Sequence, residues 1–106
     1  MLRALKQPRR VVITGMGCVT PLGIGRQNFW DGLINARSGV RKIQAFDVSS
    51  SPVQIAAEVP GFDWQAQINP KDRKHVPRTV PLALAAAREA LEDAGIHLND
   101  LSLEER

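Results

Sequence analysis

A short β-branched run lies near the start of the chain, and further along apolar residues recur at helical spacing. Val11, Val12 and Ile13 form the first run, and glycines follow at positions 15 and 17. A run of this kind suits a strand that is buried on both faces, as in a parallel sheet. The glycines suit a backbone that turns tightly or lets another group approach closely. This start therefore predicts a buried strand that opens into a Gly-rich turn.

The first helical pattern covers residues 26–36. Phe29, Leu33 and Ala36 fall at i, i+4 and i+7, which places them on one face of a helix. The Gly39 that follows can adopt a left-handed conformation, so we expect the Ser-Gly pair there to stop the helix.

The middle of the chain predicts short extended pieces separated by loops. Residues 40–43 can form a short extended piece, and residues 47–52 read as a polar surface loop. Residues 53–59 alternate, which predicts a half-exposed strand. Its apolar face would hold Val53, Ile55, Ala57 and Val59. Pro60-Gly61 ends this strand.

The last third of the chain predicts three helical pieces. Residues 62–68 can form one helical turn, and Asn69-Pro70 suits the start of a short basic helix over residues 71–76. Pro77 and Pro81 interrupt the chain before a longer helix that stops at Gly95. Its alanine-rich face predicts close packing against another helix. That face would be formed by Leu84, Ala87, Leu91 and Ala94, with Ala83 and Ala90 beside it.

Composition restricts the class of protein. A length of 106 residues allows one small domain, and the 43% hydrophobic and 24% charged contents are typical of globular proteins. No apolar run approaches the roughly 20 residues that span a bilayer, so we expect no membrane association. Aromatic residues are only 5% of the chain and zinc-finger spacing is missing, so we expect no nucleic-acid partner. Residues 1–8 read as a basic, disordered leader, without the apolar stretch of a secretory signal.

The single cysteine, Cys18, excludes an internal disulfide and a multi-cysteine metal site. It fits a reducing compartment, and we expect a cytoplasmic protein without a metal. A catalytic thiol needs a neighbouring base or a helix N-terminus to lower its pKa. Cys18 has apolar neighbours, and His75 and His97 are distant in sequence. It is interpreted as a small buried hydrophobe, and no catalytic residue is predicted.

The glycines at positions 15 and 17 raise the question of a nucleotide site. The dinucleotide fingerprint needs a third glycine at position 20, where this chain has Thr20 followed by Pro21. A phosphate-binding P-loop also lacks its Gly-Lys-Ser/Thr end. A nucleotide-binding α/β domain is therefore disfavoured, and no cofactor is predicted.

Cations gather in one segment, at Lys71, Arg73 and Lys74, with His75 and Arg78 nearby. One interpretation is a solvated helical face. The other is a docking surface that attracts an acidic partner and speeds its encounter.

Three stretches together resemble one known family. They read RRVVITGMGCVTPLG from residue 9, FWDGLINARSGV from residue 29, and EALEDAG ending at residue 95. In this order and spacing, over residues 9–96, the chain resembles the N-terminus of the elongating (type I/II) β-ketoacyl-acyl-carrier-protein synthases. The resemblance implies an α/β fold, here part of the thiolase-like five-layered α/β/α/β/α sandwich, with residues 9–106 as its N-terminal portion. It also implies homodimers and the decarboxylative condensation of malonyl-carrier protein with an acyl thioester, in fatty-acid or polyketide synthesis.

The resemblance also implies what this stretch lacks. In the family the catalytic cysteine, two histidines and a lysine lie beyond the matched region, and Cys18, His75 and His97 do not correspond to them. We therefore expect an inactive fragment that works with the remainder of the synthase or a homodimer partner. The alternative is a stand-alone module that binds carrier protein or a partner chain through the basic segment, residues 71–78.

The family's basic stretch, which meets the acidic helix of acyl-carrier protein, corresponds to residues 69–76. Lys71 and Lys74 match cationic positions there, and Arg73 adds a third cation. Pro77 and Pro81 depart from the family pattern.

Overall fold

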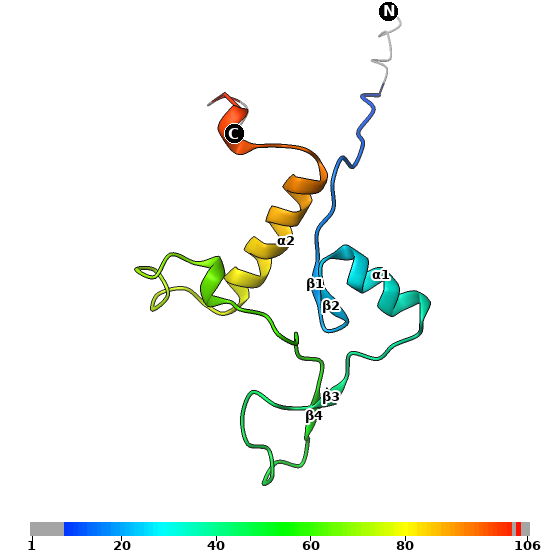
Figure 1. The fold of residues 1–106 in the computed structure, drawn as a ribbon, viewed down its shortest axis with the longest axis vertical. Helices are drawn as coiled ribbons and strands as arrows, with labels where there is room; N and C mark the ends of the chain where they lie inside the picture. The colour runs from blue at the N-terminus through cyan, green and yellow to red at the C-terminus, as the bar shows by residue number, and fades with distance from the viewer. Residues whose placement is uncertain (1–7, 103, 105–106) are drawn as a thin grey trace, which may run out of the picture.

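A computed structural model describes residues 8–102 and residue 104, and within them two helices are linked by turns and short two-stranded ribbons (Figure 1). The predicted leader over residues 1–8 lies outside the described residues except for residue 8. In chain order the elements are β1 (Val19–Thr20), β2 (Gly23–Ile24), α1 (Arg26–Ile34), β3 (Arg41–Lys42), β4 (Ile55–Ala56), the 3₁₀ helix η1 (Gln65–Gln67), α2 (Thr79–Asp93) and the 3₁₀ helix η2 (Leu98–Asp100).

The predicted buried strand at Val11–Ile13 is wrong for this structure. The segment before β1 runs as an extended trace without a ladder partner, and Val11 is 91% exposed. A doubly buried strand needs parallel neighbours on both sides, and the described part of the chain offers none. The first strand is β1, which pairs antiparallel with β2 through Val19↔Ile24 and Thr20↔Gly23.

Helix α1 confirms the first helical prediction, although its stop differs from the expected one. The left-handed residue is Ala36, with a φ of 49°, and not Gly39. The Ala36 N–H donates to the Leu33 carbonyl, and the Arg37 N–H donates to the Gly32 carbonyl. These two bonds form a Schellman motif, which satisfies carbonyls that the helix end leaves free.

The second ribbon confirms an extended piece at Arg41–Lys42 and shortens the strand predicted over residues 53–59. Strands β3 and β4 pair antiparallel through Arg41↔Ala56 and Lys42↔Ile55. The predicted apolar face is not covered, because Ile55 is 60% exposed. A two-stranded ribbon needs a packing partner to bury one face.

The basic segment is not a helix, contrary to the prediction. Residues 70–75 form consecutive turns, in which the Asp72 N–H donates to the Asn69 carbonyl and the His75 N–H donates to the Asp72 carbonyl. Six residues gain few helical hydrogen bonds for the conformational freedom that they lose, so turns are the outcome. The helical turn predicted just before this segment is confirmed by η1.

Helix α2 begins at Thr79, and Pro81 lies within its first turn, where the missing N–H has no helical acceptor to lose. At the other end Gly95 is confirmed as the stop. Its φ is 67°, and the Ile96 N–H donates to the Leu91 carbonyl over 2.9 Å. The predicted helical partner for the alanine-rich face is wrong, because that face meets the glycine segment described below.

The core is small for a chain of this length. Among the described residues, the buried apolar side chains are Val48, Ile68 and Pro81. The radius of gyration is 19.7 Å, against about 13 Å for a compact chain of 100 residues. Large apolar side chains such as Val12, Trp30 and Phe46 stay exposed, so much apolar surface lacks cover.

Candidate functional site

The glycine segment, residues 15–18, lies directly on helix α2. A Cβ on Gly15 would stand 2.2 Å from the Ala90 carbonyl oxygen, and one on Gly17 would stand 2.0 Å from the Ala86 carbonyl oxygen. No side chain fits at those distances, so glycine is required by the approach of two backbones. The face of α2 that makes this contact carries Ala86, Ala90 and Ala94, at i, i+4 and i+8. Of the two roles expected for these glycines, the close approach of another group is therefore confirmed.

Glu89 of α2 joins the glycine segment to helix α1. Its Oε2 accepts the Cys18 backbone N–H at 2.9 Å, and its Oε1 accepts the Arg26 backbone N–H at 2.8 Å. Arg26 is the first residue of α1, where N–H groups lack helical acceptors and negative charge is favoured. The Glu89 carboxylate thus acts as an external cap for α1.

Asp93, one turn further along α2, makes a second link of the same kind. Its Oδ2 accepts the Met16 backbone N–H at 3.0 Å and forms an ion pair with the Arg26 guanidinium. The hydrogen bond from Arg26, followed by that from Met16, holds the pKa of Asp93 below its ordinary value. The hydrogen bond with Asp93 also raises the pKa of Arg26. We call Glu89 and Asp93 the carboxylate pair. Sequence reasoning missed it because the backbone N–H groups that the two acids accept lie 63 to 77 positions away in the sequence.

The lowered pKa of Asp93 predicts a pH response. A carboxyl with a depressed folded-state pKa contributes stability above its unfolded pKa, and loses it as pH falls through the folded pKa. We expect the Asp93 carboxyl carbon to titrate in NMR below the ordinary 3.8, and the Met16 amide shift to follow it. Arg26→Gln should raise the midpoint. A midpoint at or above 3.8 in the unsubstituted chain would contradict the ion pair.

Cys18 lacks the environment of a catalytic thiol. Burial, and secondly the Glu89 carboxylate, raise the pKa of its half-buried thiol. A nucleophilic cysteine requires the opposite shift. His75 and His97 are exposed on the basic turns and just before η2, respectively. No group of three potential metal-ligating side chains occurs within the described ranges.

The three cations predicted to dock a partner differ in their exposure and hydrogen bonding. Lys71 and Lys74 are exposed, whereas Arg73 is half-buried and donates from Nη2 to the Gln65 carbonyl at 2.9 Å. Asn69 steadies the start of the turns, since its Oδ1 accepts the Lys71 N–H at 3.1 Å. Residues 69–76, called the basic loop, therefore present two free lysines, and Arg73 holds the loop against η1.

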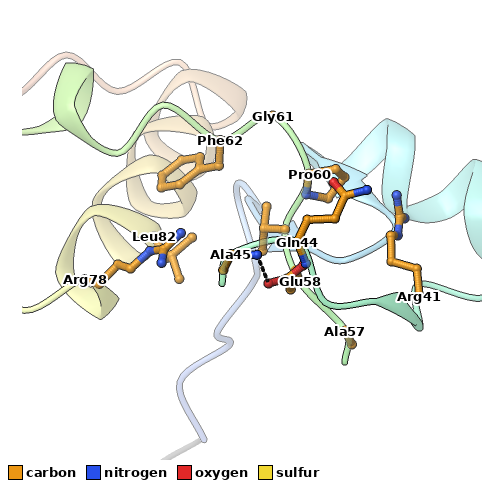
Figure 2. Close-up of a pocket in the computed structure, with 11 residues that line it drawn as sticks. Arg41, Gln44, Ala45, Ala57, Glu58, Pro60, Gly61, Phe62, Arg78 and Leu82 are labelled. Atoms are coloured by element: carbon orange, nitrogen blue, oxygen red, sulfur yellow. Dashed lines mark hydrogen bonds between the residues drawn. The ribbon is translucent and has the colours of Figure 1, made fainter. Parts of the chain in front are cut away.

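A hollow of about 450 Å³ lies between the β3–β4 ribbon and the start of α2 (Figure 2). It is lined by Arg41, Gln44, Ala45, Ala57, Glu58, Val59, Pro60, Gly61, Phe62, Arg78 and Leu82. Sequence reasoning missed this hollow, because its walls come from segments up to 41 positions apart, from Arg41 to Leu82. Among the described residues, none of the helices is both long and apolar enough to span a membrane.

Comparison with known proteins gives consistent matches. The β-ketoacyl synthase N-terminal domain model matches residues 8–105. The 3-oxoacyl-[acyl-carrier-protein] synthase 2 of Coxiella burnetii is 44% identical over 94 residues, which cover 89% of this chain and 23% of that protein. The protein of the same name from Synechocystis sp. is 34% identical over 99 residues, covering 93% of this chain and 24% of its own.

A solved structure agrees with these sequence matches. The ishigamide ketosynthase/chain length factor superposes with a TM-score of 0.71 and 39% identity, over 89% of this chain and 23% of that one. The chain thus has the backbone arrangement of a ketosynthase N-terminal region, and it spans about a quarter of the length of the curated relatives that it matches.

Proposed function

Because this chain belongs to the β-ketoacyl synthase family, we propose that residues 9–106 are the N-terminal portion of a 3-oxoacyl-acyl-carrier-protein synthase. In the complete enzyme this portion would form part of the five-layered thiolase-like sandwich. The reaction would join a malonyl-carrier-protein thioester to an acyl thioester with release of carbon dioxide, in cytoplasmic fatty-acid or polyketide synthesis.

The uncovered apolar surface carries the proposal that this portion does not act alone. Val11 and Ile13 are 91% and 83% exposed on an extended segment whose backbone has no ladder partner in the described structure. Such a segment is suited to pairing with further strands. The remainder of a synthase would supply those strands, and a homodimer partner would cover further surface.

We assign no catalytic residue to this portion. Cys18 is the single cysteine in the sequence, and burial raises the pKa of its thiol. Its role is packing, beside Gly17 and under the Glu89 carboxylate. The proposed contribution of residues 9–106 is therefore structural support and carrier-protein docking.

Docking is proposed for the basic loop, because its two lysines are exposed on consecutive turns, the first of which Asn69 steadies through the Lys71 N–H. An acidic helix of acyl-carrier protein would meet Lys71 and Lys74 directly. Arg73 would act mainly by holding the loop against η1, since its guanidinium already donates to Gln65.

The experiment combines a binding and a turnover measurement on the same preparation. We expect the chain to bind acyl-carrier protein and to form no β-ketoacyl product from malonyl- and acyl-carrier protein. Lys71→Glu combined with Lys74→Glu should weaken binding at least about tenfold, because two attractive pairs become repulsive. Isothermal titration calorimetry measures the binding, and mass spectrometry measures the product.

Arg37→Glu combined with Arg9→Glu is the matched control, since these exposed arginines lie outside the basic loop. The control should bind like the unsubstituted chain. Condensation by the purified chain would overturn the assignment of no catalytic residue, and unchanged binding of the lysine variant would overturn docking through the basic loop.

A further inference from the structure

The hollow between the β3–β4 ribbon and α2 adjoins the basic loop through Arg78. Arg78 follows the loop and lines two depressions, the 450 Å³ hollow and a smaller one of about 250 Å³ beside Trp64 and Val76. Val76 belongs to the basic loop, so Arg78 links the loop to the hollow by lining both depressions.

The lining combines apolar walls with positive charge. Phe62 and Leu82 supply apolar surface near the start of α2, and Arg78 and Arg41 approach from different sides of the hollow (Figure 2). The Arg41 guanidinium donates from Nη2 to the Pro21 carbonyl at 3.2 Å, which anchors it at the edge and leaves further N–H donors.

The acidic residue in the lining is already engaged. The Glu58 carboxylate accepts the Gln44 backbone N–H at 2.9 Å and the Ala45 backbone N–H at 3.2 Å. Its negative charge is thus used by the ribbon's own backbone. Arg41 and Arg78 therefore determine the charge preference of the hollow, and they favour an anionic group.

Size and lining together indicate the kind of occupant. Ligand-binding hollows typically span about 300–1,000 Å³ and combine apolar walls with a few polar groups, so 450 Å³ is enough for a protruding side chain. An apolar anchor inserted in a pocket, with arginine beside it, is a common centre of binding energy at protein interfaces.

We propose that this hollow is a second docking point for the acidic carrier protein, and that it receives an apolar side chain flanked by a carboxylate. The inference rests on the proposed docking function and extends it from the basic loop to the hollow. Leu82 and Phe62 contact the apolar side chain, and Arg78 pairs with the carboxylate beside it. Arg78 thereby determines which acidic surfaces fit.

Arg78→Glu in the full chain tests the proposal. Arg78 precedes the first residue of α2 and its side chain makes no capping hydrogen bond. A glutamate there also complements the helix dipole, so the substitution should leave α2 intact. We expect binding of purified acyl-carrier protein to weaken about tenfold, and its dependence on salt to become shallower. Arg78→Gln, which removes the charge without reversing it, should give a smaller loss.

Arg37→Glu is the control with the same charge change, and circular dichroism of each variant checks the helices. A loss for Arg78→Glu no larger than that for Arg37→Glu overturns the hollow as a docking point. If the lysine variant still loses binding in that case, docking through the basic loop stands on its own. If neither variant loses binding, both proposals fail. Should Arg78→Glu lose its helical signal, the Arg78→Gln comparison with Arg37→Gln decides by the same criterion.

Discussion

Gly17→Ala is expected to detach the glycine segment from helix α2. The added methyl carbon would stand 2.0 Å from the Ala86 carbonyl oxygen, 2.7 Å from the Ala90 nitrogen and 2.9 Å from the Glu89 Cβ. Two of these atoms are helix backbone, which can move only by breaking helical hydrogen bonds. Overpacking typically costs about 1–3 kcal/mol even where the neighbouring side chains can adjust, and the helix backbone has no such freedom here.

Amide hydrogen exchange measures this detachment directly. The Cys18 N–H donates to Glu89 only while the segment lies on α2, so Gly17→Ala should speed its exchange at least about tenfold. Gly61→Ala is the control, because a Cβ there has nothing within 4 Å, although its φ of 65° adds local strain. Unchanged protection of Cys18 in Gly17→Ala would show that the close contact does not persist in solution.

The roles of these glycines could be predicted from the sequence only in part. Thr20-Pro21 in place of a third glycine excludes the nucleotide fingerprint, which leaves packing as the interpretation. The identity of the packing partner could not be predicted, since it lies about 70 residues away on α2. Leu84 and Ala87 were expected to lie on the packed face, whereas both are exposed and Ala86 makes the contact. An alanine-rich helix offers several nearly equivalent faces, and tertiary structure selects one of them.

Two other predictions from the sequence were wrong for one physical reason. In both segments the local structure depends on packing partners that are distant in the sequence. Val11–Ile13 has the composition of a buried strand, but burial needs neighbouring strands that the described residues do not provide. The basic loop has good helix-starting residues, but its few residues do not sustain a helix without packing. By contrast, α1 and α2 were predicted well, because their signals are local: apolar spacing, and for α2 a stop at Gly95.

The candidate docking surface could likewise be predicted from the sequence only in part. Lys71 and Lys74 could be identified from sequence as a charged cluster, and the structure leaves both exposed. The different position of Arg73 depends on the Gln65 carbonyl, whose location no sequence pattern reveals. The docking role of all three cations remains a prediction, and the binding measurement on the lysine variant decides it.

Glu89→Ala is expected to loosen both ends of the link between α1 and α2. The Cys18 and Arg26 backbone N–H groups would both lose the acceptor that they share in Glu89. A donor left without a partner costs about 1–3 kcal/mol when buried, and the half-buried Cys18 is the more affected of the two. We expect faster amide exchange at both positions and fraying of the first turn of α1.

Glu92→Ala separates this effect from a general loss of α2. Glu92 is exposed three residues further along the same helix, and its replacement should leave Cys18 and Arg26 protected. Glu89→Gln should give an intermediate result, because its amide keeps one oxygen acceptor but places a donor against the other N–H. Equal exchange in the Glu89→Ala and Glu92→Ala variants would mean that Glu89 is not the cap of α1. The glycine segment would then be held by backbone contact with Ala86 and Ala90 and by the hydrogen bond from Met16 to Asp93, and Gly17→Ala would be the more damaging change.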